Sequence, residues 1–530
     1  MIKKEKKQNN LPMILVILDG WGIAKPGKGN AVTLAKTPTM DGITKKYPST
    51  ELFAHGRYVG LPPKQDGNSE AGHMNIGAGR VVEQDAVKIS KSINDGTFFK
   101  NAAFLQAIKH AKDNKGKVHL MGMLSNGMSA HSEPDHILAL LTLLEKNKVN
   151  NIYLHLFTDG RDSPKYASLK LIEEMQKSFK NQEIIATVMG RFYAMDRKKK
   201  WERTKMAYEA LVSGRGHVAG SASAAITESY NKGNNDEFIE PYVIDKNGQI
   251  EDGDSVIFFN LRSDRARQLA KIFVQKDFNN DNPGSPKRSK VFKDLCFVAM
   301  TDFGPDLDSI ISAFPSVDLK ETLPMIFSGI KQLYLAETEK YAHVTYFFNG
   351  GYSGRVDDED QAVISSPDVR SYDETPPMKS EELARMVIYD LGKKKYDFVL
   401  LNFAAPDMIG HTGNLAAGVE CCEKVDKYLG KIIKAYLKEK GTVLVTADHG
   451  NVEEMINLKT GEIDTEHSTN KVPFIMVNKK FSSLSALAKK NMLREDGVLG
   501  DIAPTILELV NKQKPKEMTG VSLIKKGGKL

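Results

Sequence analysis

The sequence has 530 residues, of which 41% are hydrophobic and 27% are charged, and its 74 basic and 67 acidic side chains give a formal net charge of +7. These proportions are ordinary for a globular protein, and the length exceeds what one hydrophobic core serves, so two or more domains are expected. No apolar run reaches membrane-spanning length, and three cysteines, two of them adjacent, provide no disulfide framework.

The charge excess is small for the length, and much of it lies in lysines that are expected to be solvated at the two ends: Lys3, Lys4, Lys6, Lys7, Lys525, Lys526 and Lys529. No basic helix with interleaved aromatic residues suggests nucleic-acid binding. The basic first ten residues are followed by no long apolar segment, so they do not predict a secretory signal. We therefore expect a cytoplasmic monomer that acts on a small molecule and binds neither nucleic acid nor a membrane.

In chain order, the first expected strand covers residues 11–18 and ends in Asp19 and Gly20. A Gly-rich loop is expected over 21–36. The segment Gly-Asn-Ser-Glu-Ala-Gly-His at 67–73 then places Ser69 where a helix is expected to begin. Backbone N–H groups at a helix start stabilise an anionic serine oxygen or a phosphoserine, although a serine there commonly serves only as a cap.

Residues 83–314 show helical patterns that alternate with apolar runs. Helices are expected at 85–93, 104–113, 136–146, 166–179 and 203–212, and strands at 118–123, 152–157, 184–189, 255–259 and 295–300. This alternation predicts a second α/β unit. Residues 278–290, rich in Asn, Asp, Pro and Ser, predict a surface loop.

The expected strand ends of this block carry arginines, which are Arg161, Arg191, Arg197, Arg262, Arg265 and Arg267. Guanidinium groups suit carboxylates and phosphates, so these clusters indicate a small substrate with two anionic groups. Each cluster also has an aspartate nearby, such as Asp162, so local pairing is the alternative for any single arginine. His131 and His136 are either further donors or ordinary loop histidines.

The last part of the chain contains two short apolar runs, at 398–403 and 442–447, that are expected to be strands buried on both faces. Asp407 and His411 follow the first run, Asp448 and His449 follow the second, and His467 adds a third imidazole. Parallel sheets bind ligands at the carboxyl ends of their strands. Mixed carboxylate and imidazole ligands suit Zn, Mn, Fe or Co better than Ca or Mg, which predicts a two-metal site for a phosphoryl group.

Asp19 and Ser69 precede the 83–314 block, whereas the other candidate ligands follow it. If they form one site, the metal domain is discontinuous, with parts at 1–83 and 316–530, and residues 84–315 form an inserted substrate-binding domain. Two linkers, near 80–88 and 312–320, would then make a hinge. The residues alone thus predict a two-metal phosphoryl-transfer enzyme with a serine nucleophile, and they fit a phosphatase as well as a mutase.

The motifs closely resemble, in order and over roughly residues 12–525, the cofactor-independent phosphoglycerate mutases of the alkaline-phosphatase-like superfamily. The matching segments include Leu-Asp-Gly-Trp-Gly at 18–22, Gly-Asn-Ser-Glu-Ala-Gly-His at 67–73, Thr-Asp-Gly-Arg-Asp at 158–162, Gly-Arg-Phe-Tyr-Ala-Met-Asp-Arg at 190–197, Ala-Glu-Thr-Glu-Lys-Tyr-Ala-His-Val-Thr at 336–345, Ala-Pro-Asp-Met-Ile-Gly-His-Thr-Gly at 405–413, Thr-Ala-Asp-His-Gly-Asn at 446–451 and His-Ser-Thr-Asn at 467–470. Each motif alone is weak or moderate evidence, but all of them in family order are highly specific.

The resemblance implies two α/β domains and the interconversion of 3-phosphoglycerate and 2-phosphoglycerate in glycolysis through a phosphoserine. It also implies two Mn²⁺ ions, with other divalent transition metals as alternatives, and no 2,3-bisphosphoglycerate. By motif match, one ion is held by Asp407, His411 and His467, and the other by Asp19, Ser69, Asp448 and His449. The implied catalytic residues are Ser69 as the nucleophile, Asp162 as the proton shuttle, and Lys340. The implied substrate-binding residues are His131, Arg161, Asp162, Arg191, Arg197, Arg262, Arg265 and Lys340.

One segment departs from the family pattern. The usual loop Ser-Asp-Gly-Gly-Val-His-Ser-His is here Ser-Asn-Gly-Met-Ser-Ala-His-Ser from residue 125 to residue 132, with Asn126 in place of the aspartate and a longer spacing before His131. Two alternatives remain beside the mutase. One is a metal-dependent phosphatase or phosphopentomutase on the same core, and the other is a non-catalytic protein that binds a phosphometabolite.

Overall fold

The computed structural model describes residues 12–127, 129–304, 306–307, 309–315, 319–352, 354–357, 359–457 and 460–525. The chain divides into two compact units, one made of Met1–Gln84 with Val317–Leu530 and the other of Asp85–Ser316. Both units are built on a mixed sheet with helices on its faces, which confirms the predicted α/β class. The lysines before residue 12, Lys526 and Lys529 lie outside the described residues.

The sheet of the first unit has the strand order β12-β11-β13-β1-β14-β15-β2. The five strands from β12 to β14 run parallel, whereas β15 is antiparallel to both of its neighbours. The strands are β1 (Met13–Leu18), β2 (Ser49–Leu52), β11 (Gln332–Glu337), β12 (Asp360–Ile364), β13 (Phe398–Phe403), β14 (Thr442–Thr446) and β15 (Val472–Val477). Every residue of β1 and of β13 is buried, which explains why both read as continuous apolar runs.

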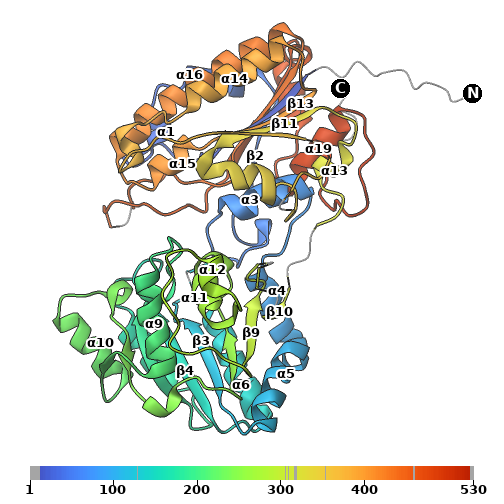
Figure 1. Ribbon diagram of the computed structural model, residues 1–530. Coiled ribbons are helices and arrows are strands. Elements are labelled where there is room, and N and C mark those ends of the chain that lie inside the picture. Colours follow the sequence, from blue (N-terminus) through green and yellow to red (C-terminus); the bar gives the residue numbers. More distant parts are fainter. Residues whose placement is uncertain are drawn as a thin grey trace, which may run out of the picture. The chain divides into compact units, whose positions relative to one another are not determined.

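Helices cover both faces of this sheet, with α14 and α16 on one side and α3, α13 and α19 on the other (Figure 1). The longest, α16, buries residues spaced three or four apart, such as Val425, Leu429, Ile432 and Tyr436, and so presents one apolar face to the core. The α-helices of this unit are α1 (Ala31–Leu34), α2 (Pro38–Lys46), α3 (Ser69–Ala78), α13 (Leu323–Ile326), α14 (Ser380–Gly392), α15 (Ala405–Gly410), α16 (Leu415–Lys438), α17 (Lys479–Ser482), α18 (Ala486–Met492) and α19 (Ile502–Leu509).

The sheet of the second unit has the order β10-β9-β8-β3-β4-β5-β7-β6, and among its neighbouring pairs β5 and β7 are antiparallel and the others parallel. Its strands are β3 (Val118–Met123), β4 (Ile152–Thr158), β5 (Ile184–Gly190), β6 (His217–Val218), β7 (Tyr242–Val243), β8 (Ser255–Phe258), β9 (Cys296–Thr301) and β10 (Ile311–Phe314). One apolar cluster contains Val118 and Leu120, and another contains Met121 and Met123. Because side chains alternate along a strand, the two clusters lie on opposite faces of the sheet.

The first of these clusters includes side chains from α4, α5, α6, α7 and α10, and the second includes side chains from α8, α9, α11 and α12. The helices are α4 (Asp85–Asp95), α5 (Ala102–Asp113), α6 (Pro134–Lys146), α7 (Ser168–Gln176), α8 (Arg191–Ala194), α9 (Trp201–Ser213), α10 (Ala222–Asn231), α11 (Ser263–Val274) and α12 (Phe278–Asp281). Among the described residues, no helix is long and apolar enough to cross a bilayer.

The expected strands and helices agree closely with those observed, and two expectations need correction. The segment 21–36 is not entirely a loop, because α1 lies within it, capped by the side chain of Asn30. The segment 278–290 begins with α12, and Phe278 is fully buried against Trp201. In both places a single helical turn is too short to show the periodicity by which helices are found in a sequence.

Candidate active site

Three carboxylates meet at one edge of the sheet in the first unit. Asp19 follows β1, Asp407 lies in α15 directly after β13, and Asp448 follows β14. β1 lies between β13 and β14, is parallel to both, and pairs Leu18 with Phe403. The strands therefore end together, and all three carboxylates are buried. Buried carboxylates need compensating positive charge, so this edge favours cations.

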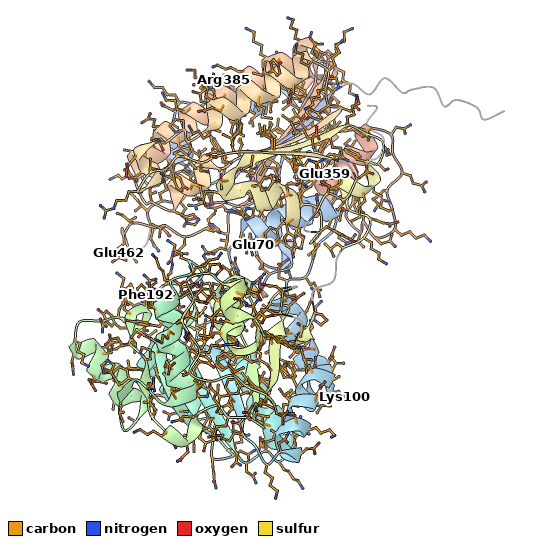
Figure 2. The ribbon with its side chains drawn as sticks, viewed as in Figure 1. Glu70, Lys100, Phe192, Glu359, Arg385 and Glu462 are labelled. Atoms are coloured by element: carbon orange, nitrogen blue, oxygen red, sulfur yellow. The ribbon has the colours of Figure 1, made fainter. Side chains whose placement is uncertain are left out.

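Ser69 begins helix α3, and its hydroxyl faces these carboxylates. The side chain of Asn68 caps the helix, which leaves the Ser69 hydroxyl free of the capping role. Ser69 Oγ lies 2.9 Å from His449 Nε2 and 3.2 Å from Asp19 Oδ1. The helix approaches the Asp448 turn closely, because a Cβ on Gly72 would come within 2.6 Å of the Asp448 carbonyl oxygen. Glu70, labelled in Figure 2, follows Ser69 in the first turn.

Lys340, at the end of the 3-10 turn Thr338–Lys340, bridges the same groups. Its Nζ lies 2.6 Å from Ser69 Oγ, from Asp19 Oδ1 and from Asp407 Oδ2. Burial would lower the pKa of Lys340, but Asp19, Asp407 and Asp448 raise it well above its ordinary value. The ammonium group of Lys340 thus lies between two carboxylates and donates a hydrogen bond to the serine oxygen.

His411 and His467 face each other in an arrangement that favours a cation between them. His411 Nδ1 donates to the carbonyl of Thr465, and His467 Nδ1 donates to the carbonyl of Gly67, because a carbonyl only accepts. In the neutral rings, both Nε2 atoms therefore carry lone pairs. These atoms lie 3.0 Å apart and 3.3–3.4 Å from Asp407 Oδ1. Two lone pairs and a carboxylate oxygen directed at one point fit a metal ion, and backbone carbonyls commonly fix the rings of metal-binding histidines in this way.

A second group of possible ligands surrounds Asp19. Two sets of three bring its carboxylate together with His73 and Asp448, and with Asp407 and His449. His449 Nδ1 donates to the carbonyl of Gly450, so its Nε2 faces Ser69 and the carboxylates. Burial would lower the pKa of His449, but Asp448, Asp19 and Asp407 raise it to about 10. Asp448 Oδ2 is buried and has no hydrogen-bond partner. The residues present therefore fit a second cation.

In the second unit, Arg191 organises the carboxyl ends of β4 and β5. It is buried at the start of α8, directly after β5, and its Nη1 lies 2.5 Å from Asp159 Oδ1 and 2.8 Å from Asp162 Oδ2. Phe192, labelled in Figure 2, follows it, and the guanidinium group of Arg203 lies over the Phe192 ring at 3.6 Å. Asp159 and Asp162 follow β4, so the buried arginine joins two neighbouring strand ends.

A cluster of cationic side chains surrounds this arginine. Burial lowers the pKa of Arg265 to about 10, together with repulsion from Arg191, Arg197 and Arg161. Burial, together with Arg262, lowers the pKa of His131 to about 3, and the buried His131 Nδ1 has no hydrogen-bond partner. Like charges held together and a buried polar atom without a partner are both stabilised by a bound anion.

Comparison with known proteins agrees with this geometry. The family described as "BPG-independent PGAM N-terminus (iPGM_N)" matches residues 89–305, and "Type I phosphodiesterase / nucleotide pyrophosphatase" matches residues 305–515. The 2,3-bisphosphoglycerate-independent phosphoglycerate mutase of Clostridium kluyveri is 48% identical over 522 residues, which cover 97% of this chain and 99% of the relative. The mutase of the same name from Moorella thermoacetica is 46% identical and covers 98% and 99%. The chain belongs to the 2,3-bisphosphoglycerate-independent phosphoglycerate mutases.

A solved phosphoglycerate mutase from Leishmania mexicana, at low cobalt concentration, has the same architecture with a TM-score of 0.79 and 29% identity over 98% of this chain and 99% of that one.

The site residues predicted for the present chain fall into two groups. In the first unit, Asp19, Ser69, Lys340, Asp407, His411, Asp448, His449 and His467 are linked by contacts of 4 Å or less. Lys340, which the resemblance assigned to catalysis and to substrate binding, therefore lies among the candidate metal ligands.

The predicted residues of the second unit lie at strand ends, but they are engaged to different degrees. Arg197 Nη1 lies 2.6 Å from Asp264 Oδ2, and Arg262 Nε lies 3.6 Å from the other oxygen of that carboxylate. Arg265 Nη1 donates to the carbonyl of Met195 at 3.4 Å. Arg161 is the most exposed of the set, with its nearest carboxylate, that of Glu237, 3.8 Å away. Local Arg–Asp pairing, the alternative that the sequence left open, is thus present alongside the cationic cluster.

Sequence reasoning missed three buried residues of this mutase that support its ligands. Asn402 Nδ2 donates to Asp19 Oδ2 at 2.6 Å and lies 3.0 Å from His73 Nε2. Asn451 Nδ2 donates to Asp407 Oδ1 at 2.8 Å. A signal was available for Asn402, because it is the one polar residue within the apolar run of β13. His73 is four residues from Ser69 in the same helix, a spacing that places both on one face.

Proposed function

We propose that the chain interconverts 3-phosphoglycerate and 2-phosphoglycerate through a phosphoserine at Ser69, without 2,3-bisphosphoglycerate. The observation that carries this proposal is the set of groups around Ser69 Oγ, where Lys340 Nζ donates to the oxygen and His449 Nε2 and Asp19 Oδ1 lie within 3.2 Å. A serine hydroxyl is a weak nucleophile until its ionised form is stabilised. Lys340 stabilises that form electrostatically.

We propose two divalent ions, with Mn²⁺ as the first candidate and cobalt as an alternative, because the solved Leishmania mexicana mutase was obtained at low cobalt concentration. Asp407, His411 and His467 would hold one ion, and Asp19, Ser69, Asp448 and His449 the other, with His73 as a further candidate ligand beside Asp19 and Asp448. When bound, such ions lower the pKa of a hydroxyl and neutralise phosphoryl oxygens. The three buried carboxylates, those of Asp19, Asp407 and Asp448, would supply the negative charge that binds such ions.

The reaction balances on residues of this chain. Ser69 Oγ forms a bond to phosphorus while the bond from phosphorus to one glycerate oxygen breaks, and in the second half the other glycerate oxygen takes the phosphoryl group back from Ser69. One proton must move from the oxygen that gains the phosphoryl group to the oxygen that loses it. We assign this transfer to the Asp162 carboxylate, and we assign retention of the anionic glycerate to His131, Arg161, Arg191, Arg197, Arg262 and Arg265.

The domain division proposed from the sequence, with a substrate-binding domain at 84–315 inserted into a metal domain, is supported by the two compact units of the fold. We also propose that the enzyme is a cytoplasmic monomer. Its three cysteines, Cys296, Cys421 and Cys422, are free and buried, which is consistent with a reducing compartment.

The test is a coupled enolase assay on 3-phosphoglycerate with Mn²⁺, which detects 2-phosphoglycerate, run beside an assay for released phosphate. Ser69→Ala is expected to lower mutase turnover by at least about 10³-fold, as loss of a covalent nucleophile does. Ser380→Ala is the matched control, because Ser380 is also a buried serine at the first position of a helix in the same unit. Near-normal turnover in Ser69→Ala would refute the nucleophile.

The same assays separate the alternatives. Phosphate release without 2-phosphoglycerate would identify a phosphatase, and the absence of both products with Mn²⁺ restored would identify a binding protein. Mass spectrometry of enzyme quenched during turnover is expected to find one added phosphoryl group on Ser69 and none in Ser69→Ala.

A further inference from the structure

The loop that departs from the family pattern brings a hydroxyl to Asp162. Ser129 is buried, and its Oγ donates a hydrogen bond of 2.7 Å to Asp162 Oδ2. The backbone N–H of His131 donates to the same Oγ at 3.2 Å, so the hydroxyl is held from both sides. The loop follows β3 and Asp162 follows β4, and these strands pair in parallel up to Met123 and Phe157. The contact therefore rests on two adjacent strand ends.

Asp162 is held by a second donor on the same oxygen. Arg191 Nη1 lies 2.8 Å from Asp162 Oδ2 and 2.5 Å from Asp159 Oδ1. Arg191 alone is shared between two carboxylates and does not fix the orientation of either one uniquely. The hydroxyl of Ser129 donates a second hydrogen bond to Asp162 Oδ2, from a different direction, and so restricts the orientation of that carboxylate. The Asp162 side chain remains about one-third exposed, at 33%, so the carboxylate is positioned and still accessible.

Ser129 is a feature of this chain's loop. The family pattern that this sequence resembles has glycine and valine between Ser-Asp-Gly and the first histidine, and neither residue has a hydroxyl. Here the corresponding stretch is one residue longer and contains Ser129.

We propose that Ser129 is a positioning residue that holds the Asp162 carboxylate in one orientation and stabilises its ionised form. The proposal deepens the proposed function and rests on it, because there Asp162 carries the proton between the glycerate hydroxyls. A hydrogen bond to an ionised carboxylate stabilises that form relative to the protonated one.

The electrostatics of the site agree with this assignment. Burial would raise the pKa of Asp162, but the charge of Arg191 and then the hydrogen bond from Ser129 hold it below its ordinary value. The other ionisable groups next to it are His131, which acts on the Asp162 carboxylate, and Asp159, whose Oδ1 accepts from the Asp162 backbone N–H at 3.2 Å. Farther out, Arg262 and Asp264 act on His131, and Arg265 is repelled by Arg191. Removing the hydroxyl leaves these charges in place and takes away two hydrogen bonds, the one to Asp162 Oδ2 and the one from the His131 backbone N–H. Only the first of them contacts the carboxylate directly.

The experiment compares the wild type with Ser129→Ala, Ser129→Thr and Ser163→Ala, each with saturating Mn²⁺. Ser163 is the matched control, because it is buried beside Asp162 but its hydroxyl donates to Asn126 Oδ1 at 3.0 Å instead. In Ser129→Ala the acid limb of the pH profile of kcat/KM is expected to move up by about one pH unit, and kcat to fall about tenfold with little change in KM. Threonine, which keeps the hydroxyl, is expected to restore both, and Ser163→Ala to match the wild type.

A second measurement makes the result independent of catalysis. A ¹³C-NMR titration of the Asp162 carboxyl, assigned by its absence in Asp162→Asn, is expected to give a pKa about one unit higher in Ser129→Ala than in the wild type. If this difference is found but the wild type has no mutase activity, the positioning role stands and the proposed function fails. If the mutase is active and both the profile and the carboxyl titration of Ser129→Ala overlay the wild type, the positioning role is overturned.

Discussion

The support of Asp19 by Asn402 gives a prediction that separates a metal-site role from a packing role. Asn402→Leu keeps the branched shape and the number of heavy atoms in the side chain and removes the amide. It leaves Asp19 Oδ2 without its 2.6 Å donor and His73 Nε2 without its 3.0 Å partner, both fully buried. A buried polar group left without a partner costs about 1–3 kcal/mol, and more when it is charged, so the free energy of unfolding of the metal-free enzyme is expected to fall by about 3–5 kcal/mol.

The same change is expected to weaken metal binding. Outer partners of metal ligands typically contribute a factor of about 10–100 in affinity, because they orient the ligand before the metal binds. Mn²⁺ affinity, measured by calorimetric titration of chelated and dialysed protein, is expected to fall within that range. Urea unfolding of the same samples gives the stability.

Asn349→Leu is the matched control. Asn349 is equally buried and also donates to a carboxylate, with Nδ2 3.0 Å from Oε1 of Glu359, the residue labelled in Figure 2. Its loss is expected to lower stability by about 1–3 kcal/mol and to leave Mn²⁺ affinity unchanged. Unchanged Mn²⁺ affinity in Asn402→Leu, or an equal loss in both variants, would refute the reasoning, because the amide would then act only through packing.

Two further predictions concern metal and pH. Mn²⁺ at about 100 times its dissociation constant is expected to raise the free energy of unfolding of the wild type by about 2.7 kcal/mol for each ion bound, measured by urea unfolding with and without chelator. This increase in the free energy of unfolding should be smaller in His411→Ala. It should persist in the control His217→Ala, which removes an exposed histidine paired with Glu240. Equal increases in the two variants would contradict the ligand assignment. Burial lowers the pKa of His136 from 6.5 to about 4, so the unfolded chain binds the proton first, and this residue's contribution to stability is lost as the pH falls from 6.5 to 4. The loss amounts to about 3 kcal/mol, so His136→Leu is expected to flatten the acid side of the stability curve by that amount, and identical curves would contradict the assignment.

The eight strands expected by residue range are all present among the fifteen of the described residues, and they were recognisable because most of them are buried on both faces. Continuous apolar runs such as those of β1 and β13 are not compatible with a strand that faces solvent on one side. The two short helices α1 and α12 lie in segments that were expected to be loops, because one turn carries no periodicity. The sequence thus predicts elements whose burial pattern extends over several residues, and it misses those that tertiary packing alone stabilises.

Most candidate ligands were recognised because a charged or imidazole side chain follows an apolar run, as at Asp19, Asp407 and Asp448. Ser69 was recognised by its place at an expected helix start, and His467 as an additional imidazole. The supporting residues were not, because their signal is weaker. Asn402 lies inside strand β13 and His73 inside helix α3. A single polar residue within such an element does not by itself indicate a functional role. Lys340 follows β11 by three residues and was placed among the site residues only through family resemblance.

The sequence does not show which strands lie next to each other in the sheet. Parallel strands place their carboxyl ends at the same edge of a sheet whatever their order, so Asp19, Asp407 and Asp448 were assigned to one edge without knowing which strands are neighbours. Pairing individual ligands requires the order β13-β1-β14, which is set by packing between segments hundreds of residues apart. Because β1 lies in the centre, its carboxylate is within reach of the groups that follow both neighbours. Asp19 accordingly belongs to both sets of possible ligands that contain neither His411 nor His467. A substitution at Asp19 should therefore disturb the candidate site more widely than one at Asp448, a ranking that the sheet order predicts and the linear sequence does not.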